Sequence, residues 1–378
     1  MMKRALWLVA LATVIMVCCG GLIPAAASHM ETDGDHYYRL LDSDGALIHE
    51  TSLQVNEGDI YIDRDNHRWE VVKVEGRIAW CRYDGDETLP AHRASTLGAD
   101  ISGVVPVESV APVVAIYHTH SDESYIPSDG VESEYGEGGI YDVGAAFVQA
   151  LEQHGFIVEY SEEAHDPHDI NAYSRSRGTA LDLLENRPDL IIDVHRDATS
   201  AGEYETTVEG EDATRIKIVV GSQNPNMKNN LEFAKQLKSA MDEIKPGLSN
   251  GIYVGKGDYN QDLSPHALLI EVGTHTNTKE EAEQGVEQFA DMLAEVYGLK
   301  AAQASESETG EGNAPGAGTI NDAGENTAAD EGTPGAVRKP LDTEQESKNG
   351  YVAAVLILLA VAIAGGGWYW LNHGPKAK

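Results

Sequence analysis

Strand-length apolar runs alternate with helix-forming segments between about residues 111 and 300, and this alternation restricts the fold more than any other feature of the sequence. Five runs have the length of a buried strand; they lie at residues 112–117, 156–160, 190–194, 216–220 and 267–272. Regular strand–helix alternation predicts an α/β fold, in which helices flank a mostly parallel sheet of five or six strands.

The segments between these runs carry apolar residues at helical spacing. Val143, Phe147 and Leu151 mark one helix face, and Gly155 follows as a stop signal. A second face contains Leu231, Ala234, Leu237 and Met241. The last helix is predicted to start at Thr278, because Glu281 stands three residues later in the spacing of a capping box.

Residues 36–86 have a different pattern, in which short alternating segments flank turn residues. The turn at 42–45 separates segments 37–41 and 46–50, and Glu75-Gly76 separates 69–74 from 77–83. We predict a small accessory β-domain here, without a cluster of catalytic residue types. A linker near 87–110 is expected to join it to the main domain.

Both ends of the chain predict a membrane-attached protein with its main domain outside the cytoplasm. A short basic start, an apolar run and Ala25-Ala26-Ala27 form a signal peptide pattern at 1–27, with an uncleaved N-terminal anchor as the alternative. Residues 351–371 contain no charge and predict a transmembrane helix, and Lys376 and Lys378 favour a cytoplasmic C-terminus. Between them, the Gly-, Ala- and acid-rich residues 301–350 predict a disordered acidic linker.

Charge and cysteine content exclude several classes of function. A formal net charge of −35 opposes binding to nucleic acid phosphates and to anionic lipid surfaces. Of three cysteines, Cys18 and Cys19 lie in the N-terminal apolar run, which leaves Cys81 alone in the predicted folded region. The chain therefore has neither a disulfide framework nor a thiolate zinc site.

Metal-binding residue types lie at or just past the ends of three of the predicted strands. The run at 112–117 leads into His118, His120 and Glu123; the run at 190–194 leads into His195; the run at 267–272 contains Glu271 near its end. Ligands of open α/β sheets bind beyond the carboxyl ends of the strands. Three such ends bearing His, His and Glu therefore predict a metal site.

Catalytic zinc takes three protein ligands and leaves one position for water, and two histidines with one carboxylate meet that requirement. Glu271 closes an otherwise apolar strand and is predicted to be the general base rather than a ligand. His120 is preferred over His118 because it lies further past the strand end. The other histidines are expected to be ordinary, with His165 and His168 solvated in a polar loop.

Five segments resemble motifs of the stage II sporulation protein P family, which belongs with zinc-dependent N-acetylmuramoyl-L-alanine amidases. They lie in order at residues 116–125, 173–177, 192–198, 259–265 and 269–278, and the resemblance covers about 110–297. It implies an amidase-like catalytic domain at 111–298. It also implies that peptidoglycan is the substrate, with hydrolysis of the amide between muramic acid and L-alanine and cleavage of peptide cross-links as an additional activity.

The resemblance further implies an endospore-forming bacterium, septal wall degradation during engulfment, and a lytic transglycosylase partner at the membrane. It assigns Zn²⁺ ligation to His120, Glu123 and His195, and the catalytic carboxylate to Glu271. Arg196, Asn260 and Gln261 are implied to bind substrate. Glu132, Glu134 and Glu137 are alternatives to Glu123. The predicted C-terminal span departs from the N-terminal anchor expected for the family.

Two other functions compete with a zinc amidase. His118, His120 and Asp122 form an H-x-H-x-D fragment, as in two-metal hydrolases such as metallo-β-lactamase-like phosphodiesterases, but Glu123 stands where that motif needs another histidine. A cell-wall-binding surface protein without catalysis would need a broken site, whereas His120, Glu123, His195 and Glu271 are all present.

Overall fold

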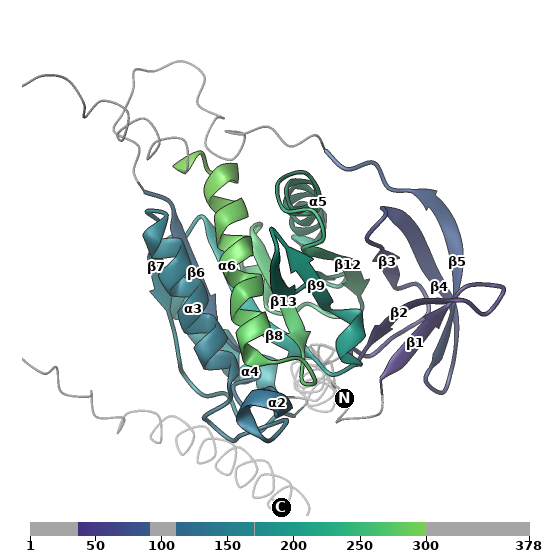
Figure 1. The fold of residues 1–378 in the computed structure, drawn as a ribbon, viewed down its shortest axis with the longest axis horizontal. Helices are drawn as coiled ribbons and strands as arrows, with labels where there is room; N and C mark the ends of the chain where they lie inside the picture. Colours follow the sequence, from purple (N-terminus) through teal and green to yellow (C-terminus); the bar gives the residue numbers. More distant parts are fainter. Residues whose placement is uncertain (1–36, 91–110, 170, 300–378) are drawn as a thin grey trace, which may run out of the picture. The chain divides into compact units, whose positions relative to one another are not determined.

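The computed structural model describes residues 37–90, 111–169 and 171–299 (Figure 1). Their main feature is an 11-stranded sheet with the order β2-β1-β5-β4-β3-β12-β11-β13-β8-β6-β7. Its strands are β1 (Tyr38–Leu41), β2 (Leu47–Thr51), β3 (Ile60–Ile62), β4 (His67–Glu75), β5 (Ile78–Asp86), β6 (Val113–Tyr117), β7 (Ile157–Tyr160), β8 (Leu190–Asp197), β11 (Ile216–Gly221), β12 (Ser249–Gly255) and β13 (Ala267–Thr274). A separate hairpin joins β9 (Glu205–Val208) to β10 (Glu211–Thr214).

The half of this sheet from β12 to β7 confirms the predicted mixed α/β fold with a mostly parallel sheet. The pairs β12–β11, β13–β8, β8–β6 and β6–β7 are parallel, and β11–β13 is antiparallel. The six strands from β12 to β7 agree with the predicted five or six strands of the main domain. The sheet continues beyond them, because β3 pairs antiparallel with β12 and joins it to the N-terminal strands. Neither of the two joining strands shows a clear strand pattern in the sequence, because β3 is only three residues long and β12 contains Gly251.

Helices cover one face of the sheet, and Figure 1 shows α3 (Ile140–Gln153) and α6 (Lys279–Val296) side by side across it. Together with α5 (Met227–Ile244), they enclose the largest apolar core, which includes Phe147, Leu237 and Phe289. The described residues form two further α-helices, the short α2 (Ile126–Asp129) and the longer α4 (Ala172–Leu184). The predicted start of α6 is confirmed, since Thr278 and Glu281 form a capping box.

The opposite face of the sheet is covered by two different elements. Side chains alternate along a strand, so Val219, Tyr253 and Leu269 point away from the helical core; they pack against Leu40, Tyr61 and other residues of the N-terminal strands. Further along, Ala180 of α4 joins Ala115 and Ile191 in a smaller cluster. We call residues 38–86 the N-terminal strand unit and the strands from β12 to β7 the main sheet. The N-terminal strand unit covers part of the second face of the main sheet.

Several predictions lie outside the described residues: the signal peptide at 1–27, the linker at 301–350 and the transmembrane helix at 351–371. Within the part of the chain that is described, no helix combines the length and the apolarity needed to cross a bilayer.

A buried carboxyl group of the N-terminal strand unit gives a testable pH dependence. Asp59 is 4% exposed, and its Oδ2 accepts hydrogen bonds from the Asn56 backbone N–H at 2.7 Å and the Tyr253 hydroxyl at 2.8 Å. Burial outweighs these hydrogen bonds and raises the pKa of Asp59 from 3.8 to about 6. The folded state therefore holds this proton more tightly than the unfolded state, and this group destabilises the fold increasingly as pH rises from about 4 through 6.

Replacing Asp59 by Asn is expected to remove that destabilisation while keeping an acceptor for both donors. The shift corresponds to about 3 kcal/mol at neutral pH. Urea unfolding at pH 4.5 and 7.5 is expected to show a gain in unfolding free energy for Asp59→Asn that is larger at pH 7.5. The exposed Asp65→Asn is the matched control. A gain that does not change between the two pH values would contradict the prediction.

Candidate metal centre

Three neighbouring strands, β6, β8 and β13, bring the predicted site residues to one edge of the sheet. These strands run parallel, so their carboxyl ends lie together. His195 near the end of β8 is the register partner of Glu271 on β13. The loop after β6 supplies His120 and Glu123, and both side chains are buried.

His120, Glu123 and His195 form a compact group in which one ligand atom of each lies within 4.8 Å of the others. Glu123 Oε1 lies 3.0 Å from His120 Nδ1 and 3.3 Å from His195 Nδ1. The other carboxylate oxygen, Oε2, accepts the backbone N–H of Arg196 at 2.9 Å. Two imidazoles and one carboxylate form a donor set that fits zinc, with three protein ligands and a fourth position for water.

Asp193 lies behind His195 and fixes its ring. Its Oδ1 is 2.9 Å from His195 Nε2, and Thr119 donates to Asp193 through its backbone N–H at 2.8 Å and its hydroxyl at 2.6 Å. Burial lowers the pKa of His195, but the carboxylates of Asp193 and Glu123 outweigh it and raise the pKa well above 6.5. A carboxylate on the far nitrogen orients a histidine ligand and increases its basicity.

His118 lies apart from this group. Its Nδ1 is 2.9 Å from the carbonyl oxygen of Val194, and its Nε2 is 3.0 Å from the hydroxyl of Tyr160. Burial lowers the pKa of His118 to about 4, so the ring is neutral at physiological pH. Both ring nitrogens therefore face other partners, and the structure brings His120 rather than His118 to Glu123.

The alternative acids are exposed to solvent, namely Glu132, Glu134 and Glu137, whereas Glu123 is fully buried. The H-x-H-x-D fragment is also separated in space, because Asp122 Oδ1 lies 3.1 Å from His168 Nδ1 while His118 faces Val194 and Tyr160. Of these candidate acids, Glu123 is therefore the one whose carboxylate lies next to both His120 and His195.

Glu271 is fully buried and lies outside the three-residue group. It is the register partner of His195 on β8 and of Lys217 on β11. This position, beside the group but not within it, is the one that a proton acceptor needs. The roles of Glu271 as base and of His120, Glu123 and His195 as ligands remain predictions.

The predicted substrate-binding residues are buried and make contacts within the protein. The Arg196 guanidinium donates to the carbonyl oxygens of Ser124 at 3.2 Å and Glu132 at 2.9 Å, which holds the loop that carries Glu123. Asn260 Nδ2 donates to the Tyr173 carbonyl oxygen at 3.0 Å. Gln261 Nε2 donates to the Val219 carbonyl oxygen at 2.9 Å. Their contact with substrate remains a prediction.

Two histidines expected to be ordinary and solvated have different positions. His165 is 3% exposed, and its ring nitrogens lie 2.7 Å from the His118 carbonyl oxygen and 2.8 Å from the Thr179 hydroxyl. The His168 ring stacks on His120, with ring centroids 3.7 Å apart. Local sequence gives no signal for either position, because both depend on the loop folding back over the end of β6.

Comparison with known families identifies the chain. The sequence profile described as stage II sporulation protein P matches residues 54–294, which include every residue discussed above at the metal centre. The chain belongs to the stage II sporulation protein P family. Stage II sporulation protein P of Bacillus subtilis (strain 168) is 33% identical over 204 residues. That match covers 49% of this chain and 51% of the relative, so it spans about half of each.

Solved amidase structures also show similarity to this member of the family. The N-acetylmuramyl-L-alanine amidase Ami1 from Mycobacterium smegmatis is 17% identical, with 51% of this chain and 98% of that chain covered and a TM-score of 0.32. The CwlD amidase from Clostridioides difficile, solved in complex with the GerS lipoprotein, is 15% identical, with 52% and 100% covered and a TM-score of 0.34.

Proposed function

We propose that this chain is a zinc-dependent peptidoglycan hydrolase that cleaves the amide between N-acetylmuramic acid and L-alanine. The observation that carries the proposal is the buried His120–Glu123–His195 group with Glu271 beside it at the edge of the sheet. Membership of the sporulation family supports a cell-wall substrate.

Each residue has a defined part in the proposed reaction. His120, Glu123 and His195 would hold the ion, and Asp193 would keep the His195 ring oriented. At this position a zinc ion would supply Lewis-acid chemistry, which makes water a stronger acid and so a better source of the nucleophile. Glu271 accepts a proton from the attacking water and returns it to the amide nitrogen as the carbon–nitrogen bond breaks. The products are the lactyl carboxylic acid of muramic acid and the free amine of the stem peptide.

We also propose the biological setting that the family and the chain ends suggest. The hydrolase would act outside the cytoplasm on septal wall during sporulation, tethered to the membrane by residues 351–371 with a cytoplasmic C-terminus. A lytic transglycosylase at the membrane would be its partner, and cleavage of peptide cross-links would be an additional activity. Family membership and the uncharged C-terminal segment support these assignments.

Product analysis tests the reaction and the metal together. Purified sacculi are incubated with the full chain, and soluble products are identified by mass spectrometry with chelator, without chelator, and after zinc is added back. We expect intact stem peptides that begin with a free L-alanine amine, their loss on chelation, and their return with zinc. Disaccharide-linked peptides as the only products would refute amidase specificity, and activity unaffected by chelation would refute the metal.

A further inference from the structure

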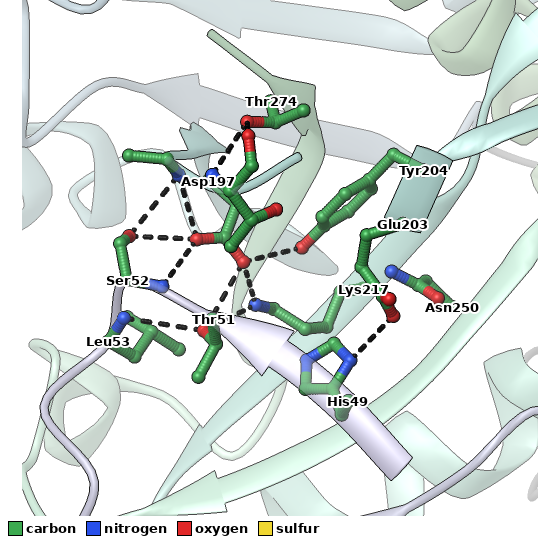
Figure 2. Close-up of polar contacts among 12 residues, drawn as sticks. His49, Thr51, Ser52, Leu53, Asp197, Glu203, Tyr204, Lys217, Asn250 and Thr274 are labelled. Carbon is green, nitrogen blue, oxygen red and sulfur yellow. Dashed lines mark hydrogen bonds and ion pairs between the residues drawn. The ribbon is translucent and has the colours of Figure 1, made fainter. Parts of the chain in front are cut away.

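The N-terminal strand unit reaches the end of β8, close to the metal centre. Thr51 is the last residue of β2, and Ser52 follows it. The Ser52 backbone N–H and hydroxyl donate to Asp197 Oδ1 at 2.8 and 2.7 Å, and the Thr51 hydroxyl donates to Asp197 Oδ2 at 3.2 Å (Figure 2). Asp197 is the last residue of β8, two positions after His195.

A fully buried cation completes this cluster. Lys217 Nζ forms an ion pair with Asp197 Oδ2 and donates to the Thr51 hydroxyl oxygen at 2.9 Å. The Tyr204 hydroxyl also donates to Asp197 Oδ2, at 2.9 Å. We call Thr51, Ser52, Asp197, Tyr204 and Lys217 the junction network. A buried ion pair is stable only when further hydrogen bonds satisfy it, and Thr51 and Ser52 supply several of these from the N-terminal strand unit.

The junction network lies on the same face of the sheet as the catalytic residues. Asp197 and His195 are two positions apart on β8, so their side chains share a face. Lys217 on β11 is the register partner of Glu271, which is itself the partner of His195. The ion pair between Asp197 and Lys217 therefore links the strands on either side of Glu271.

We propose that Thr51 and Ser52 are positioning residues for the metal centre, so that the N-terminal strand unit is a required part of the hydrolase. This inference rests on the proposed function. The two hydroxyls hold Asp197 against Lys217, and that ion pair fixes β8 and β11 around Glu271. The region at 36–86 is predicted from sequence to be an accessory domain without catalytic residue types. Through Asp197, it would instead help to position the residues of the metal centre.

Paired substitutions in the full chain test this role. Thr51→Val combined with Ser52→Ala removes both hydroxyls with little change in volume. Ser52→Thr keeps the donor and serves as the conservative variant. Ser200→Ala is the matched control. The Ser200 hydroxyl donates to Glu50 Oε2 at 2.6 Å, so it also joins the N-terminal strand unit to the segment that follows β8, but it does not contact Asp197.

We expect the double variant to lower kcat on sacculi by about 10- to 100-fold and to weaken zinc affinity about 10-fold, with KM within about twofold of wild type. Zinc affinity is measured by competition with a chromogenic chelator in the absence of substrate, and kcat at saturating zinc. Ser52→Thr and Ser200→Ala are expected to remain near wild type. Circular dichroism and thermal unfolding confirm that each variant is folded.

The two proposals fail in different ways. If the wild-type chain is active and the double variant matches Ser200→Ala in both kcat and zinc affinity, the positioning role is wrong. The proposed hydrolase activity then still stands. If the wild-type chain binds zinc but does not hydrolyse sacculi, the proposed hydrolase activity is wrong. Weaker zinc binding by the double variant would in that case still support the positioning role. A wild-type chain that neither binds zinc nor hydrolyses sacculi overturns both. A double variant that fails to fold is replaced by Ser52→Ala alone, for which the same comparison decides.

Discussion

Replacing Glu271 by Gln is expected to lower hydrolysis of sacculi by about 10²- to 10⁴-fold while zinc remains bound at one ion per chain. The amide has nearly the same volume as the carboxylate but does not accept the proton of the attacking water. Because Glu271 lies beside the His120–Glu123–His195 group and not within it, all three predicted ligands stay in place. Release of free stem peptides is measured by mass spectrometry, and zinc by atomic absorption after dialysis.

Glu132→Gln is the matched control for this substitution. Glu132 is exposed on the loop held by Arg196, so its loss removes a nearby carboxylate without touching the buried group. Near wild-type release of stem peptides is expected for it. If the Glu271→Gln variant releases stem peptides at the wild-type rate, another group accepts the proton.

Replacing His195 by Ala is expected to lose both zinc and activity. The substitution leaves two of the three predicted ligands, and it also leaves Asp193, which is buried, without the ring that faces it. Loss of the charge partner of a buried carboxylate typically costs about 3–5 kcal/mol, so a lower thermal midpoint is expected as well. Zinc stoichiometry after dialysis is the deciding measurement, made at a temperature where the variant is folded.

His118→Asn provides the comparison, because His118 is equally buried but contacts Val194 and Tyr160 instead of Glu123. It is expected to destabilise the fold and to keep zinc. Stoichiometric zinc in His195→Ala together with its loss in His118→Asn would reverse the assignment of the ligands.

The parts of the fold that are predictable from sequence are those that local pattern determines. Amphipathic spacing predicts α3, α5 and α6, and the capping box at Thr278 predicts where α6 begins. Polar residues at or just past the ends of apolar strand-length runs likewise indicate His195 and Glu271, because parallel strands end at one edge of the sheet.

The remaining features depend on contacts between residues far apart in the sequence. The sequence around Thr51 and Ser52 does not indicate a functional role. Nothing in the sequence distinguishes their partner Asp197 from the many other acidic residues of the chain. The stacking of His168 on His120 depends on how a loop folds back. Such contacts are set by tertiary packing, which periodicity and residue type alone do not encode.

The pairing of β3 with β12 has a consequence for the order in which the chain folds. Ile62 is opposite Ile252, so the N-terminal strands are synthesised long before the strand that completes their sheet. Until then, β3 is an edge strand with unpaired backbone groups, which invite pairing with other chains. During synthesis, the chain is therefore most prone to wrong pairing at β3 until β12 has been made, and any interaction that covers this edge in the meantime favours correct folding.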